Sequence, residues 1–207
     1  MNEIPNVLNP DTFPQILAEE FEGTDVEVTI YNKEQLEEME MNGILAVGRG
    51  SKHDPAFVEL TYKGDDSKPL VALVGKGVTF DTGGISLKGG RDLSSMKMDM
   101  GGAAAVAGAM KLLASTKAAV NVVALIQIVE NMPDSNSLLP GEVIQFKNGH
   151  NVQVGNTDAE GRLILADGLI RAGELEADYV FNIATLTGAI VAALGSKVGG
   201  IFGDEEL

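Results

Sequence analysis

The chain has 207 residues, of which 44% are hydrophobic, and this is enough to bury the core of one domain. Its formal net charge of −15 repels nucleic-acid phosphate and anionic lipid, so neither is an expected partner. The absence of cysteine excludes disulfides and thiolate metal sites, which is compatible with a cytoplasmic protein. No apolar run reaches the roughly 20 residues that span a bilayer, and no signal peptide is visible.

The N-terminal part predicts a lead-in followed by short elements. Residues 1–25 form the lead-in segment, in which Thr12 caps a helix that continues to Phe21. Residues 26–31 alternate apolar and polar side chains, as a strand does. Residues 33–41 have helical composition, and the following Gly43 predicts that the helix stops there.

The central part predicts two strands and a long loop. Residues 57–62 and 70–74 are the strands, and the polar turn between them makes a hairpin plausible. Residues 75–102 are rich in glycine and have weak periodicity, which predicts a long loop. Loops of this length are uncommon in compact domains and are usually functional or disordered.

The C-terminal part alternates between helices and strands. A small-residue helix over 103–115 precedes an apolar strand over 120–129, which we expect to be buried on both faces. Asn148-Gly149 predicts a hairpin between strands 143–146 and 151–154. The remaining elements are a helix over 162–172, a buried strand over 179–184 and a helix from 188 to 194.

This order predicts an α/β fold with a largely parallel central sheet and helices on both faces. Ligands of such sheets bind beyond the carboxyl ends of the strands. Three predicted strands lead to polar residues at that edge: the strand ending at Val74 to Lys76, the strand ending at Val154 to Asp158, and the strand ending at Ala184 to Thr185.

The segment Asn156 to Leu163 contains Asp158, Glu160 and Arg162 at alternate positions. In an extended segment these side chains share one face, where two carboxylates can hold a divalent metal and the arginine an anion. Considered alone, Asp158 is equally well explained as the cap of the following helix.

A second charged cluster lies in the glycine-rich loop and comprises Lys76, Asp81, Lys88 and Asp99. Lys76 follows an apolar strand, so its amine should be partly buried, and burial lowers a lysine pKa until the neutral amine can ligate metal. A buried Lys76–Asp81 salt bridge is the structural alternative. A phosphate-binding loop is a weaker one, because the required glycine spacings are not met.

His53 and His150 occupy positions typical of surface turns and are not expected to take part. A site made of hard oxygens and an amine favours Mn, Mg or Zn.

At these residues the sequence resembles the leucyl aminopeptidase (cytosol aminopeptidase) family of dinuclear metallopeptidases. Asn-Thr-Asp-Ala-Glu-Gly-Arg-Leu at 156–163 matches the signature octapeptide of that family. The segments 74–88 and 96–103 match its other hallmarks, and similarity extends to Ala-Thr-Leu-Thr-Gly-Ala at 184–189. The resemblance implies a partial zinc-peptidase-like catalytic domain over residues 26–207.

The resemblance also implies a role for each matching residue. The tighter metal would be held by Lys76, Asp81, Asp99 and Glu160. The more exchangeable metal would be held by Asp81, Asp158 and Glu160. Lys88 and Arg162 would be catalytic without ligating metal. Met96, Thr185 and Leu186 would contact the substrate.

The implied reaction is removal of the N-terminal residue, with a leucine-like preference, from peptide substrates by a metal-bridging hydroxide. The cofactors would be two Zn or Mn ions, with bicarbonate at Arg162 as proton shuttle. Family members are cytoplasmic hexamers with an additional N-terminal domain and a longer C-terminal part, so we expect a truncated catalytic domain. The alternative is a metal-binding fragment without turnover that acts as a structural or interaction module.

Overall fold

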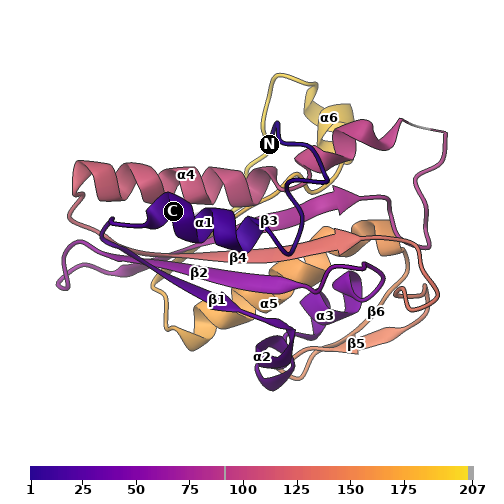
Figure 1. The fold of residues 1–207 in the computed structure, drawn as a ribbon, viewed down its shortest axis with the longest axis horizontal. Helices are drawn as coiled ribbons and strands as arrows, with labels where there is room; N and C mark the ends of the chain where they lie inside the picture. The colour runs from indigo at the N-terminus through magenta and orange to yellow at the C-terminus, as the bar shows by residue number, and fades with distance from the viewer. Residues whose placement is uncertain (91, 205–207) are drawn as a thin grey trace.

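The computed structural model describes residues 1–90 and 92–204 (Figure 1). Its main sheet has five strands in the order β1 (Val26–Tyr31), β2 (Ala56–Lys63), β4 (Asn121–Asn131), β3 (Leu70–Asp81) and β7 (Tyr179–Ile183). β1 pairs antiparallel with β2 and β2 with β4, whereas β3 is parallel to β4 and β7. The predicted mixed sheet is therefore confirmed, with β2 alone reversed.

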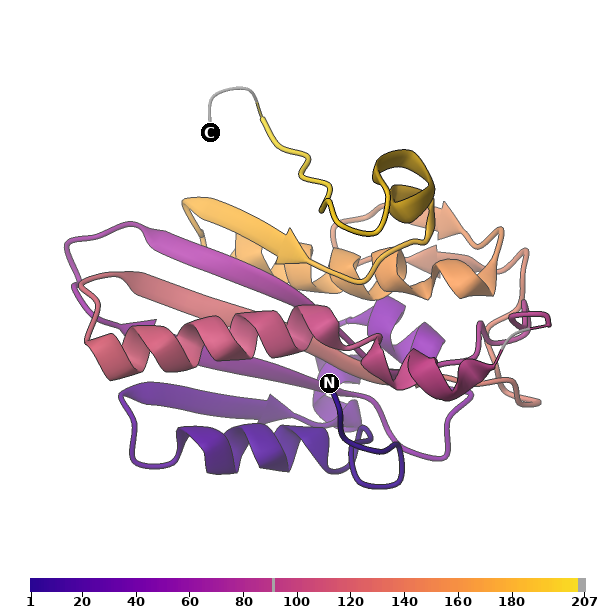
Figure 2. The same ribbon diagram turned by 90° about the horizontal axis from the view of Figure 1, so that it is seen from above.

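Helices cover both faces of this sheet, as predicted (Figure 2). One buried cluster joins α1 (Phe13–Phe21) and α4 (Gly101–Thr116) to the sheet. The cluster on the other face includes residues of α2 (Lys33–Glu38), α3 (Asn42–Gly48) and α5 (Glu160–Glu174). The last helix, α6 (Ala189–Leu194), follows β7 and has no buried residue.

The lead-in contributes to the core. Leu8, Phe13, Leu17 and Phe21 lie in the same buried cluster as residues of β2 and α4. Thr12 stands at the N-cap position of α1, but its hydroxyl donates to the Val7 carbonyl at 2.6 Å and caps no helix N–H. The predicted division between lead-in and domain at residue 25 stays a prediction, and residues 205–207 lie outside the described part.

The predicted hairpin between the strands at 57–62 and 70–74 is wrong. β4 lies between β2 and β3, so these two strands do not pair. β4 satisfies the backbone groups of both neighbours, antiparallel to β2 and parallel to β3. A turn signal between two strands shows that the chain reverses, but it does not show which strands form hydrogen bonds with each other.

The predicted loop over 75–102 is also wrong in part, because β3 continues as far as Asp81. Glycine inside this strand reflects close neighbours, since a Cβ at Gly75 would lie 2.6 Å from the Val106 side chain and one at Gly77 would lie 2.4 Å from the Gln127 carbonyl oxygen. The 3-10 helix η1 (Leu93–Met98) shortens the loop further.

The predicted stop at Gly43 is wrong as well. α2 ends at Glu38, and Glu40 turns the chain with a positive φ of 56° before α3 begins. Gly43 lies inside α3, where a Cβ would be 2.3 Å from the Leu163 carbonyl oxygen of α5. This glycine therefore allows two helices to approach closely.

Asp167 lies at the same contact between α3 and α5. Its side chain is almost fully buried, and its carboxylate accepts a 2.7 Å hydrogen bond from the Ile44 N–H in the first turn of α3. Burial raises the pKa of Asp167 to about 7, although the hydrogen bonds from the Ile44 and Gly43 N–H groups oppose the shift. The neutral carboxyl is thus favoured in the folded protein.

We expect Asp167 to make stability depend on pH. Because its folded pKa is above its ordinary value, the stability it contributes is full below about pH 4 and is lost as pH rises through about 7. The free energy of unfolding of the wild type, relative to Asp167→Asn, should fall by up to roughly 3 kcal/mol from about pH 5 to about pH 8. Urea unfolding measures this, and the exposed Asp66→Asn should show no such trend.

The second predicted hairpin is confirmed, but it forms a sheet of its own. β5 (Val143–Gln145) and β6 (Asn151–Gln153) pair antiparallel, and Gly149 between them has a φ of +88°. The strand that precedes Asp158 therefore does not belong to the central sheet, contrary to the prediction. The octapeptide instead begins after this separate hairpin.

β7 is exposed along its whole length, although its apolar sequence predicts a buried strand. Among the described residues it is an edge strand, paired with β3. Tyr179 and Phe181 are each 46% exposed. An apolar run shows that a strand can be buried, whereas its position in the sheet decides whether it is.

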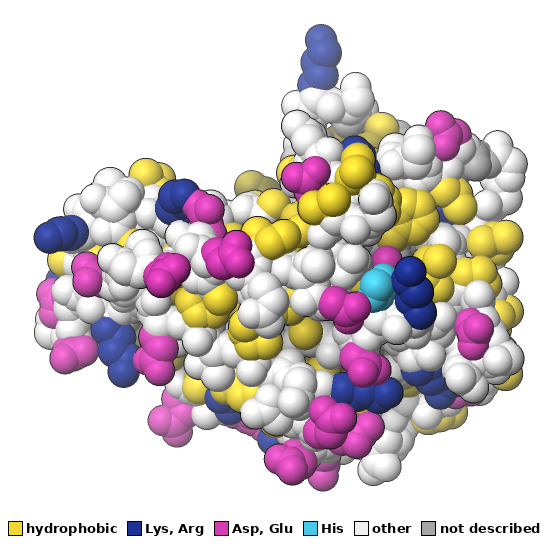
Figure 3. Space-filling model, in the orientation of Figure 1, with side chains coloured by type: hydrophobic (Ala, Val, Ile, Leu, Met, Phe, Trp, Pro, Cys, Tyr) yellow, Lys and Arg dark blue, Asp and Glu magenta, His cyan; other side chains and the backbone are white. Residues whose placement is uncertain are grey.

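The surface carries many charges of both signs. On the face shown in Figure 3, acidic side chains are spread among basic ones. Over residues 1–90 and 92–204, no helix is long and apolar enough to span a membrane.

Candidate metal centre

Three carboxylates from the two motif segments converge beyond the end of β3. Asp81 is the last residue of β3, Asp158 lies in the 3-10 helix η2 (Thr157–Ala159), and Glu160 begins α5. Each offers a carboxylate oxygen, and these oxygens all lie within 4.8 Å of one another. Asp158 does not cap α5, and its own N–H is instead bound by the Asn156 side chain at 2.8 Å. This spacing suits a divalent cation.

Lys76 joins the cluster from within β3, where its side chain is 2% exposed. Its ammonium lies 2.7 Å from Asp99 Oδ2 and 2.8 Å from Glu160 Oε1, and it donates to the Thr185 carbonyl at 3.1 Å. Lys76 therefore pairs with Asp99 and Glu160, and not with Asp81 as the structural alternative predicted.

The expected lowering of the Lys76 pKa is not found. Burial lowers this pKa, but the charges of Glu160 and Asp99 outweigh burial, and the net shift is upward. Binding metal through Lys76 would therefore require its proton to leave, as is general for protein ligands.

Lys88 occupies the other side of the cluster. Its ammonium lies 2.7 Å from Asp81 Oδ2 and also contacts Asp158. Burial opposes its charge, but the hydrogen bonds and charges of these two carboxylates raise the Lys88 pKa well above its ordinary value. Lys88 thus keeps a positive charge beside the carboxylates.

Two buried carboxylate oxygens in this cluster lack hydrogen bonds. They are Glu160 Oε2 and Asp99 Oδ2, of which Asp99 Oδ2 is compensated by the charge of the Lys76 ammonium at 2.7 Å. Burial raises the pKa of Glu160 to about 7 and also raises the pKa of Asp99. Glu160 Oε2 has no such compensation. A buried acceptor of this kind is costly unless a cation or proton satisfies it, so the residues fit a metal ion.

The remaining predicted site residues lie around this cluster. Thr185 follows β7 and donates its hydroxyl to Asp99 Oδ1 at 2.7 Å. Leu186 comes within 3.0 Å of where a Cβ at Gly161 would lie. Met96 is half-buried in η1, and Arg162 is exposed in the first turn of α5.

Asn131 and Thr157 also contact the cluster, although neither was predicted from the sequence. Asn131 donates from Nδ2 to Asp81 Oδ1 at 2.9 Å and to the Thr157 carbonyl at 3.0 Å. The Thr157 hydroxyl donates to the Gly83 carbonyl at 2.6 Å and accepts from the Ser86 N–H at 2.8 Å. The signal for Asn131 was that a polar residue ends an apolar strand.

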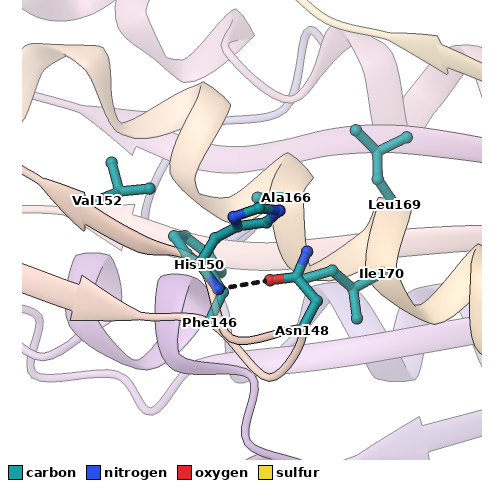
Figure 4. A pocket seen from close by; sticks show the side chains of 7 residues that line it. All are labelled: Phe146, Asn148, His150, Val152, Ala166, Leu169 and Ile170. Carbon is teal, nitrogen blue, oxygen red and sulfur yellow. Dashed lines mark hydrogen bonds between the residues drawn. The ribbon is translucent and has the colours of Figure 1, made fainter.

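The histidines lie outside the carboxylate cluster. His150 is exposed and lines an apolar hollow of about 420 Å³ between the β5–β6 hairpin and α5 (Figure 4). The backbone N–H of His150 donates to Asn148 Oδ1 at 3.2 Å, which supports the hairpin turn. His53 is half-buried, contrary to the expected surface position, with Nδ1 2.5 Å from Asp11.

Fold and site together define an α/β domain with a carboxylate- and lysine-rich centre at the carboxyl edge of its sheet. All 207 residues match the family described as "Cytosol aminopeptidase family, catalytic domain". The chain is 44% identical to a probable cytosol aminopeptidase of Persephonella marina and 49% identical to one of Cereibacter sphaeroides. These alignments cover the whole chain but 41% and 42% of the relatives.

Solved structures agree with this result. The bottromycin maturation enzyme BotP matches 94% of the chain at 41% identity, with a TM-score of 0.87, and the chain covers 41% of it. BotP in complex with Mn matches with a TM-score of 0.89, and the chain covers 43% of it. The chain belongs to the cytosol aminopeptidase family, and it spans about two fifths of the length of the curated relatives it matches.

Proposed function

We propose that the chain carries the catalytic centre of a metal-dependent aminopeptidase that removes the N-terminal residue, with a leucine-like preference, from peptides. The observation that carries this proposal is the convergence of three carboxylates whose oxygens lie within 4.8 Å of one another, one of which, Glu160, has a buried oxygen without a hydrogen bond. Family membership supports the same reaction class.

Two divalent cations would be shared among the clustered residues. Lys76, Asp81, Asp99 and Glu160 would hold one, whereas Asp81, Asp158 and Glu160 would hold the other. The BotP complex with Mn supports manganese, and zinc suits the same donors. When bound, such ions activate water as a nucleophile and polarise a carbonyl.

The side chains around the ions would complete the reaction. Lys88 keeps its positive charge and would stabilise the negative charge that develops on the scissile carbonyl oxygen. Arg162 offers an exposed guanidinium that suits a planar anion such as bicarbonate, which would carry a proton. Met96, Thr185 and Leu186 would line the substrate path.

A manganese titration combined with a peptidase assay tests this function. We expect up to two Mn ions per chain by electron paramagnetic resonance, and metal-dependent release of p-nitroaniline from leucine p-nitroanilide. The aspartate analogue of this substrate, measured in parallel, tests the leucine-like preference. A chain that binds no Mn or Zn would contradict the proposal.

A second candidate is a metal-binding module without turnover. The exposed apolar β7 and the exposed Leu186 favour it, because both adjoin the predicted substrate path and are uncovered here. Two bound ions without hydrolysis would support this alternative.

The relatives' names place those proteins in the cytosol, and we propose the same location here. The hexamer stays a prediction.

A further inference from the structure

Asn131 connects the two halves of the carboxylate cluster. It is the last residue of β4 and is 4% exposed. Its side-chain amide donates to Asp81 Oδ1 on one side and to the Thr157 carbonyl on the other, at 2.9 and 3.0 Å. Its own carbonyl accepts from the Thr82 N–H at 3.0 Å and from the Thr82 hydroxyl at 2.8 Å. One residue thus binds both the end of β3 and the octapeptide.

These contacts determine which way Asp81 faces. Oδ1 of Asp81 is taken by Asn131 and by the Gly83 N–H, each at 2.9 Å. Oδ2 is therefore the oxygen that faces Lys88, at 2.7 Å. The bond to Thr157 also holds the residue next to Asp158, so Asn131 limits the distance between the two carboxylates.

We propose that Asn131 is a positioning residue, which sets the orientation of Asp81 and its spacing from Asp158 for cation binding. This inference rests on the proposed function, because the spacing matters only if the cluster binds metal. Outer-shell partners of metal ligands commonly contribute roughly 10–100-fold to metal affinity. A buried amide that only satisfies backbone groups would contribute to stability and not to affinity.

The test compares Asn131→Asp with Asn148→Asp. Both changes preserve size and add one negative charge, but Asn148 lies in the exposed β5–β6 turn. At position 131 the aspartate loses the N–H donors and places a second carboxylate beside Asp81. We expect Mn affinity, measured by electron paramagnetic resonance, to fall roughly 10–100-fold in Asn131→Asp and to stay unchanged in Asn148→Asp. Unchanged affinity in a folded Asn131→Asp would overturn the proposal.

A second measurement needs no metal and no variant. Nuclear magnetic resonance of the metal-free wild type reports hydrogen exchange of the Asn131 side-chain amide. We expect slow exchange compared with the exposed Asn148 amide, because the Asn131 amide is buried and hydrogen-bonded. Rapid exchange would overturn the positioning role even if Asn131→Asp failed to fold. Slow exchange in a chain that binds no Mn would contradict the proposed function while leaving the hydrogen bonds of Asn131 in place.

Discussion

Replacing Glu160 by glutamine should remove most of the divalent-metal affinity of the chain. Glutamine keeps the size of the side chain but removes the charge that two cations would share. Glu160 is 2% exposed, and its carboxylate oxygen lies within 4.8 Å of those of Asp81 and Asp158. We expect the Mn dissociation constant to rise by more than the roughly 100-fold that loss of an outer-shell partner costs at most.

Calorimetric titration with Mn measures this loss, and Glu19→Gln is the matched control. Glu19 is an exposed residue of α1, so its replacement changes the net charge equally without touching the cluster. Wild-type affinity in Glu160→Gln would show that Glu160 is not a ligand, and it would remove the central residue of the proposed site.

The second large effect concerns packing. Gly102, in the first turn of α4, lies against β7, and a Cβ there would be 2.0 Å from the Ile183 carbonyl oxygen and 2.8 Å from the Lys76 N–H nitrogen. Both neighbours are backbone atoms and cannot rotate away. Gly102→Ala should therefore cost about 3 kcal/mol, the upper end of overpacking changes, which lowers the melting temperature by about 6–12 °C.

Gly108→Ala in the same helix is the control, with an expected effect of opposite sign. Nothing lies within 4 Å of a Cβ at Gly108, so alanine adds helix propensity there without a clash. We expect a gain of roughly 0.5–1 kcal/mol in the free energy of unfolding. Equal melting temperatures for the two variants would contradict the close contact between α4 and β7.

Local patterns were sufficient to predict most elements. The alternation at 26–31 matches β1 in both bounds, and the apolar run at 120–129 predicts β4 within two residues at each end. These predictions succeed because the side-chain pattern of each segment agrees with the environment of that segment in the fold. The five predicted metal-ligand residues also converge in space, since each lies at or near the carboxyl edge of the sheet.

Features that depend on distant partners were missed. Gly43 predicts a helix stop from the sequence, but in the structure it lies at a contact between two helices. A Cβ at this position would clash with the Leu163 carbonyl oxygen, which is distant in the chain. Lys76 and Asp81 lie in β3 and not in a loop. The glycines between Val74 and Val78 do not mark a loop, because neighbouring backbone and side chains leave no room for a Cβ there. The role of Asn131 depends on Asp81 and Thr157, neither of which is close to it in the sequence.

The position of β4 has a consequence for how the chain acquires its structure. β2 and β3 emerge from the ribosome before their common partner, which begins at residue 121. Until then β2 and β3 each have an unpaired edge at the position where β4 will lie. Such non-local pairing raises contact order, which slows folding and prolongs exposure of unpaired edges. During synthesis, the halves of the central sheet can therefore join only after α4 has been made.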